Sequence, residues 1–200
     1  MEKSVFNTES QQKDIASKIV VSLERISEAF KSLLWNYAKT IGISPIQIQL
    51  LIFITYHKSE FCKVSYLANE FNLTKPTISD AIKVLNKKGL IQKNYTEFDN
   101  RSYTISLTEK GKKIVSKTEN FANPIKKEIE KATKNELESL YKSLNQVIYS
   151  LNKTGVLTVQ RTCYSCKFYE KLEENHYCHL LKNKLSNSEI RVDCTEYENY

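Results

Sequence analysis

Four cysteines near the C-terminus are the residues with the clearest potential for chemistry. They follow the pattern Cys163-x2-Cys166-x11-Cys178-x15-Cys194. Four thiolates that open with a CxxC pair complete the tetrahedral ligand set of a zinc ion, and the same number holds an iron–sulfur cluster. The surrounding segment has few apolar residues, so a bound metal would supply the missing stability. The sequence therefore predicts a metal site at these cysteines, with zinc as the first assignment and an iron–sulfur cluster as the alternative.

The spacing alone does not choose between these two centres. Zinc ribbons usually close with a second CxxC pair, which is missing here. The unequal loops, and the run Lys167-Phe168-Tyr169 that follows Cys166, are similar to small domains that hold a four-iron cluster. A third interpretation is that the cysteines are unliganded or form an oxidisable pair. His176 and His179 flank Cys178 and could replace a thiolate, but we interpret both as surface residues or as residues behind the ligands.

A second set of polar residues lies at the start of a predicted helix. Residues 64–115, called the reader below, predict a short helix, a turn, a basic helix and two strands joined by a polar loop. This order is typical of a winged helix-turn-helix, whose second helix enters the DNA major groove with its N-terminal residues against the bases. The predicted DNA-binding residues are Lys75, Pro76, Thr77, Ser79, Asp80 and Lys83 of that helix and Arg101 of the wing.

These side chains suit DNA in different ways. Thr77 and Ser79 can bond to bases or phosphates, and Asp80 can accept a hydrogen bond from a cytosine amino group. Arg101 belongs to the predicted wing tip at 96–101, where it can enter a minor groove whose negative potential favours arginine. The alternative is an amphipathic helix with a solvated basic face. The predicted wing favours DNA binding, because fold, charge and loop chemistry then agree.

Apolar periodicity predicts the elements that position both sites. Steps of three and four over 15–37 predict a long helix that ends near Gly42. Ser44 and Gln47 form a capping box at the start of a buried helix, with Pro45 in its first turn. Further predictions are a short strand at 61–64, helices at 65–71 and 75–88, strands at 90–95 and 102–107, a helix from Glu109 that Pro124 kinks or restarts, and a helix at 134–152.

Composition and charge narrow the class of protein. The 200 residues allow one medium domain and a small appendage, and the formal net charge is +7. Residues 60–117 contain eleven Lys and Arg and six Asp and Glu. From residue 154 onward there are six Lys and Arg and seven Asp and Glu. The basic surplus therefore lies in the reader, as a polyanionic partner requires. The sequence contains neither a membrane span nor the apolar core of a signal peptide, so we expect a cytoplasmic protein, where clustered cysteines more often bind metal than form disulfides.

The reader and its flanking helices resemble the MarR family of transcriptional regulators over roughly residues 15–153. The residues that carry the likeness are Leu67-Ala68, Leu73-Thr74-Lys75-Pro76-Thr77-Ile78-Ser79, Leu85, Lys88-Gly89-Leu90-Ile91, Asp99 with Arg101, and Leu107-Thr108-Glu109-Lys110-Gly111. The likeness implies a homodimer with one winged helix on each half of a pseudo-palindromic operator. It also implies a repressor that a small phenolic ligand or cysteine oxidation releases. Many relatives carry arginine where this sequence has Asp80, so the family's operator contacts do not carry over there.

The homodimer also follows from the size of the reader. A winged domain of about fifty residues is too small to bury the apolar stripes of the helices at 15–37 and 134–152, so we expect them to bury each other across a subunit interface. The predicted fold is thus mainly α with a small β-wing, in two parts. Residues 1–153 form the DNA-binding and dimerisation domain, and residues 154–200, called the cysteine module below, form a small metal-binding unit.

Two other classes of function are alternatives to the DNA-binding regulator. One is a redox, electron-transfer or metal-sensing protein that uses its winged helix for protein interaction. The other is a thiol oxidoreductase acting through Cys163 and Cys166, but the thioredoxin-like context that it needs is missing. With no Ser/His/Asp set and no phosphate-binding glycine loop in the sequence, we predict that the chain is not an enzyme. We interpret Cys62, His57 and the aromatic residues Trp35, Tyr37 and Tyr56 as structural, although those aromatics could line an effector pocket.

Overall fold

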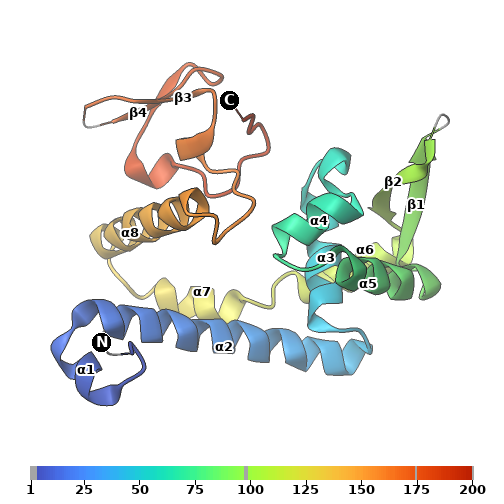
Figure 1. Cartoon of the computed structure of the whole chain (residues 1–200), viewed down its shortest axis with the longest axis horizontal. Coiled ribbons are helices and arrows are strands. Elements are labelled where there is room, and N and C mark those ends of the chain that lie inside the picture. The colour runs from blue at the N-terminus through green and yellow to red at the C-terminus, as the bar shows by residue number, and fades with distance from the viewer. Residues whose placement is uncertain (1–3, 97–98, 174, 200) are drawn as a thin grey trace.

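The computed structural model describes residues 4–96, 99–173 and 175–199, without the side chains of Ser10, Thr96 and residues 99–101. The described chain is mainly helical, with a two-stranded wing and a small three-stranded sheet near the C-terminus (Figure 1). The helices are α1 Thr8–Lys13, α2 Ile15–Ile41, α3 Pro45–Tyr56, α4 Val64–Glu70, α5 Lys75–Lys87, α6 Glu109–Thr118, α7 Asn123–Ile129 and α8 Lys134–Lys153. The strands are β1 Ile91–Thr96, β2 Asp99–Leu107, β3 Tyr169–Lys171, β4 His176–Cys178 and β5 Asn183–Leu185, and short 3-10 turns lie at η1 Ser59–Phe61, η2 Cys163–Ser165 and η3 Asn187–Glu189.

The long helices begin and end at the residues that the sequence marks. The capping box of Ser44 and Gln47 opens α3, with a bond of 3.0 Å from the Ser44 backbone N–H to the Gln47 side chain. Thr133 and Glu136 open α8 in the same way, with a bond of 2.8 Å. Gly42 ends α2 in the left-handed conformation, with φ at 71°. These predicted boundaries are confirmed.

The core of the molecule lies inside the reader and around α3. Helix α3 is buried nearly all round, as predicted, and it packs against α2, α5, α6 and β2. Helix α5 turns one apolar face toward this core and leaves its opposite face exposed. The fully buried residues of this core include Ile48, Leu50, Leu51, Leu67, Ile78, Ile82, Leu85 and Ile105.

The wing is an antiparallel hairpin that leads directly from α5 back to α6. Its register pairs Ile91 with Leu107 and Tyr95 with Tyr103, and a shift follows after Tyr95. The rings of Tyr95 and Tyr103 lie 5.4 Å apart, and the Lys93 ammonium lies 4.4 Å from the Tyr103 ring centre. These cross-strand contacts stabilise a hairpin that has no third strand beside it among the described residues.

The structure corrects three details of the predicted elements. The strand expected at 61–64 is wrong, because η1 and the start of α4 occupy this segment; the Cys62 carbonyl accepts one bond of 2.9 Å from the Ile105 N–H, which does not make a ladder. Helix α1 was not predicted. Strand β2 begins at Asp99 rather than at residue 102, and the rest of the predicted wing tip, residues 97–98, lies outside the described residues.

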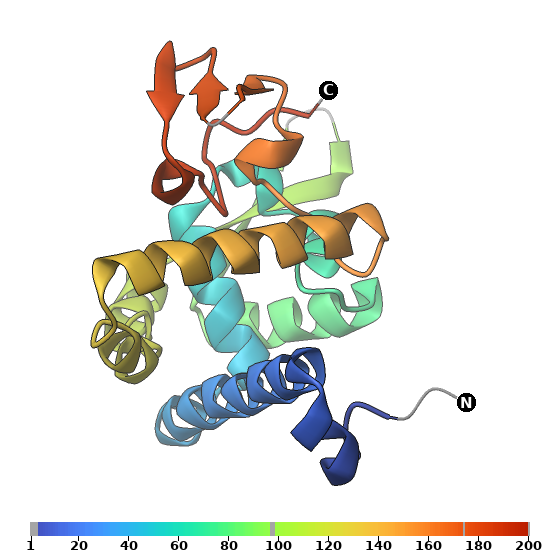
Figure 2. The ribbon, with the colours of Figure 1, turned by 90° about the vertical axis from the view of Figure 1, so that its left-hand side faces the viewer.

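Helices outside the reader support the cysteine module. The N-terminal half of α2, together with α7 and α8, extends away from the reader, and the module lies on α8 (Figures 1 and 2). The Tyr141 hydroxyl of α8 donates to the Ile190 carbonyl, and the rings of Tyr149 and Tyr164 lie 5.5 Å apart. Among the described residues no single helix is long and apolar enough to cross a membrane, and α2 and α3 reach that length and composition only as a pair, bent by 95°.

Gly111 allows α6 to approach the start of the wing closely. A Cβ atom there would lie 2.0 Å from the Leu90 carbonyl oxygen, which already accepts a bond of 3.1 Å from Thr108. We therefore expect Gly111→Ala to lower the free energy of unfolding by about 3 kcal/mol, because backbone rather than a flexible side chain must move. Urea unfolding followed by circular dichroism measures this loss. Ser116→Ala, at an exposed position of the same helix, is the control, and equal stability of both variants would contradict the close approach.

Candidate DNA interface and cysteine pocket

The exposed face of α5 presents the predicted DNA-binding residues. Thr74 caps the helix and accepts a hydrogen bond of 3.3 Å from the Thr77 N–H. The two hydroxyls also lie 2.8 Å apart, so the Thr77 side chain is held at the helix start. Ser79 is half-buried, whereas the remaining predicted residues of this helix are exposed: Lys75, Pro76, Thr77, Asp80 and Lys83.

Asp80 and Lys83 form an ion pair on this face. The Lys83 ammonium donates to the Asp80 carboxylate at 2.9 Å, and both side chains are 71% exposed. The hydrogen bond and the charge of Asp80 raise the pKa of Lys83. The pair cancels one positive charge one turn into the helix, which leaves Lys75 as the unpaired cation among the described side chains of this predicted set.

The wing lies beside α5 in the fold, as a winged helix-turn-helix requires (Figure 1). Arg101 belongs to β2, close to the hairpin tip, but its side chain is outside the described part of the structure. Its role in the minor groove therefore remains a prediction.

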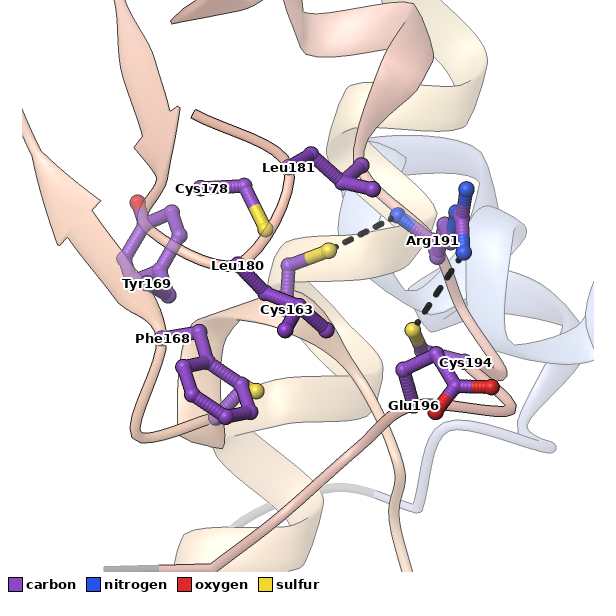
Figure 3. Close-up of a pocket in the computed structure, with 10 residues that line it drawn as sticks. Cys163, Phe168, Tyr169, Cys178, Leu180, Leu181, Arg191, Cys194 and Glu196 are labelled. Atoms are coloured by element: carbon purple, nitrogen blue, oxygen red, sulfur yellow. Dashed lines mark hydrogen bonds between the residues drawn. The ribbon is translucent and has the colours of Figure 1, made fainter. Parts of the chain in front are cut away.

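The four cysteines line one pocket in the cysteine module, which η2, β3 and β4 build together with the segment after η3 (Figure 3). Apolar side chains form most of its wall: Phe168, Tyr169, Leu180 and Leu181. Among the described residues, no three His, Cys, Asp or Glu side chains are gathered as ligands of one metal ion. The cysteines are also free of disulfides. The structure thus brings the four predicted ligands to one pocket without bringing their sulfurs to one point.

Arg191 contacts two of these thiols (Figure 3). Its backbone N–H donates to the Cys163 sulfur at 3.2 Å, and its guanidinium donates to the Cys194 sulfur at 3.5 Å. Burial raises the pKa of the Cys163 thiol, against the lowering effect of the Arg191 N–H. Donors at this distance stabilise sulfur in its anionic, metal-binding form.

A segment from the end of α2 through α3 and into the wing of the reader matches a known family. Residues 41–102 match the model of the MarR family. Over these residues the chain is therefore similar to the MarR family. This likeness agrees with the prediction from the sequence that the chain is not an enzyme. A search of curated proteins gives no match.

Solved structures support the same fold over a larger part of the chain. A MarR protein from Peptoclostridium difficile is 21% identical, with 77% of this chain and 96% of that chain covered and a TM-score of 0.61. MepR of S. aureus in its DNA-binding conformation is 22% identical over 66% of this chain and 98% of that chain, with a TM-score of 0.59. MepR in complex with DNA is 23% identical over 66% and 96%, with a TM-score of 0.57. The predicted MarR-like fold is therefore confirmed.

The histidines and Cys62 have structural partners, as the sequence suggested. Both ring nitrogens of His176 are engaged, with Tyr169 at 2.7 Å and Asn187 at 3.0 Å. His176 is buried, which excludes a surface position and agrees with the other interpretation, a residue behind the predicted ligands, whereas His179 is exposed and bonds to Glu170 at 2.8 Å. Cys62 is buried, and desolvation raises its pKa to about 11, so this thiol is inert.

Sequence reasoning missed Arg161, which joins the cysteine module to the MarR-type reader. Its side chain is 5% exposed, and it donates to Glu70 of α4 at 2.6 and 3.1 Å and to Asp193 at 2.7 and 2.8 Å. It also donates to the Tyr66 hydroxyl at 2.7 Å. His57, at the end of α3, bonds to Asp193 at 2.9 Å and therefore closes the same network. The only signal in the sequence is that Arg161 and Asp193 stand next to the segments that carry Cys163 and Cys194.

The aromatic residues considered for an effector pocket have separate partners. Trp35 is 52% exposed and lies under the Lys39 ammonium at 5.9 Å. The Tyr56 hydroxyl donates to Glu119, and Tyr37 packs at the edge of the core. A small-molecule effector therefore stays a prediction from the family likeness.

Proposed function

We propose that the protein is a sequence-specific transcriptional regulator that binds a pseudo-palindromic operator as a homodimer, with repression as its mode of action. One observation carries this proposal: the MarR-type segment presents the exposed polar start of α5 beside its wing. In such a reader the helix start meets base edges while flanking groups hold phosphates. MepR, which shares the fold, has been solved in complex with DNA.

The homodimer is supported by apolar residues that the single chain leaves exposed. On α2 they recur at steps of three and four: Ile15, Ile19, Leu23, Ile26 and Phe30, between 37% and 71% exposed. Helix α8 adds Leu140, Val147 and Leu151, between 38% and 48% exposed. Exposed apolar stripes of this kind indicate an interface, and two-fold symmetry lets one surface serve both subunits. Two readers placed by such an axis would face half-sites about one helical turn apart.

The cysteine module is proposed to hold a metal centre through Cys163, Cys166, Cys178 and Cys194, in a structural or sensory role. The support is its small apolar core, whose buried cluster consists of Cys163, Leu185 and Ile190 among the described residues. Strands of three residues each cannot stabilise such a unit alone. A metal bound by thiolates supplies the missing free energy of folding.

The operator is the first thing to identify. Genomic fragments captured by the purified full-length protein and then sequenced should share an inverted repeat. If no fragment is enriched over bulk DNA, the regulator proposal fails and the alternative, a redox, electron-transfer or metal-sensing protein that uses its winged helix for protein interaction, takes its place.

Lys75→Ala and Arg101→Ala test the reader directly. We expect each to weaken operator binding roughly tenfold, because each removes a cation from the face that meets DNA. The plot of log affinity against log salt should also become shallower by about 0.9 for each phosphate that the variant no longer neutralises. Fluorescence anisotropy with the captured operator measures both. Lys126→Ala removes the same charge from exposed α7 and is the control; equal effects of all three variants would point to nonspecific attraction.

A further inference from the structure

Among the described residues, the cysteine sulfurs of the pocket are not drawn together as a single zinc ion would hold them. Zinc–sulfur bonds of about 2.3 Å draw four tetrahedral sulfurs to about 3.8 Å from one another. The described cysteines, histidines and carboxylates form no group of three that could hold one ion. Yet all four cysteines line the same pocket, and the sulfurs of Cys163, Cys178 and Cys194 lie around a space that Leu180 and Leu181 also line (Figure 3). Sulfur atoms that surround a space in this way are better placed to bind a centre of several metal ions than a single ion.

The chemistry of the wall fits such a centre. A four-iron cluster is larger than one ion and is held in apolar surroundings that limit its exposure to solvent. Phe168 and Tyr169 supply aromatic wall on the side of the CxxC pair, and Leu180 and Leu181 follow directly after β4. Cys163 and Cys166 are buried, so two ligands lie inside and two lie nearer the surface.

Arg191 provides the hydrogen bonds and the positive charge that this centre requires. Four thiolates around a cluster carry net negative charge, which a buried site must balance. The Arg191 backbone N–H contacts Cys163 at 3.2 Å and its guanidinium contacts Cys194 at 3.5 Å, so one residue serves two of the four sulfurs. Donors to ligand sulfur are also among the groups that set the potential of iron–sulfur centres. No other described arginine or lysine lines this pocket, and the Glu196 carboxylate, which also lines it, is paired with Lys58 at 3.1 Å.

We propose that Cys163, Cys166, Cys178 and Cys194 bind a four-iron, four-sulfide cluster, one thiolate to each iron. The inference names the metal centre of the proposed function and is independent of whether the reader binds DNA. When bound, the cluster supplies a one-electron redox centre. The residues of this chain hold the cluster, cover it with apolar side chains and balance its charge through Arg191.

The test is the metal content of the full-length protein. After anaerobic purification, or reconstitution with ferrous iron and sulfide, we expect about four irons and four sulfides per chain. We also expect a brown colour that dithionite bleaches. Cys178→Ser and Cys194→Ser should lose most of the iron, whereas Cys62→Ala, remote from the pocket, should keep it.

Three outcomes separate the cluster from the more general metal centre. About four irons per chain with equimolar sulfide support the cluster. One colourless zinc per chain, with no iron taken up on reconstitution, overturns the cluster and leaves the metal centre standing. A module that holds no metal and still keeps its hydrogen-exchange protection overturns both. The content of the unmodified chain decides between them even if the serine variants fold poorly, and operator binding is scored separately.

Discussion

Ile26→Glu is expected to turn the protein into a monomer and to weaken operator binding at least a hundredfold. Ile26 lies in the middle of the exposed α2 stripe and is 45% exposed in the single chain. In a two-fold interface the substitution introduces two glutamates at once, and each would lose its hydration without a partner. Loss of the dimer leaves each reader to bind one half-site alone, which removes the gain of roughly a hundredfold or more from linked binding.

Sedimentation or light scattering measures the oligomeric state, and fluorescence anisotropy measures operator affinity. Lys31→Gln is the matched control, because it lowers the net charge by the same one unit at an exposed position of α2, where Lys31 pairs with Glu28. This control should remain a dimer. A dimeric Ile26→Glu protein with unchanged affinity would place the interface elsewhere.

The elements of the reader could be predicted because their signals are local. Capping residues such as Thr74 and Thr133 indicate the start of a helix from only a few neighbouring residues. Apolar periodicity indicates which face of the helix is buried. The strand expected at 61–64 was wrong because a strand needs a hydrogen-bonding partner, and a local signal does not show whether one is present. Its apolar residues Phe61 and Val64 are needed by the core, but neighbouring β2 offers the segment only one backbone bond among the described residues, so a 3-10 turn forms instead.

The sequence could predict only those site residues that lie close together in sequence or are of the same residue type. The four cysteines were grouped by type, and the structure brings them to one pocket. Their donor Arg191 escaped prediction, although it stands only three residues from Cys194. The contact of Arg161 with Glu70 also escaped prediction, because partners separated by 91 residues leave no spacing pattern. A buried arginine is also contrary to its usual exposed position, so composition argues against it.

Arg161→Gln is the second substitution expected to have a large effect, with a loss of about 3 kcal/mol in the free energy of unfolding. Removing one partner of a buried ion pair leaves the other charge uncompensated, and the measured cost of such changes starts near this value. Glu70 would be left in place, with its side chain 19% exposed. Asp193 is 45% exposed and contributes less, because water screens its charge.

Lys167→Gln is the control for this substitution. Lys167 pairs with Glu198 inside the same module, but the two side chains are 41% and 57% exposed, so less than about 1 kcal/mol should be lost. Urea unfolding at neutral pH compares the two variants. Equal losses would mean that the buried network stabilises no more than a surface pair.

The loss of unfolding free energy in Arg161→Gln should also depend on pH. The hydrogen bonds that Asp193 accepts determine the direction of this dependence. Burial raises the pKa of Asp193, but hydrogen bonds from Arg161 and His57 outweigh it and hold the pKa below its ordinary value. A carboxylate with a lowered pKa in the folded state stabilises the fold above its unfolded pKa, and this stabilisation is lost as the pH falls through the folded value. The unmodified protein should therefore lose stability in acid, whereas the variant has already lost this contribution. The difference between them should shrink from about pH 7 toward about pH 3, and a difference that stays constant would show that Arg161 acts through packing on Phe53 and Phe61 rather than through its charge.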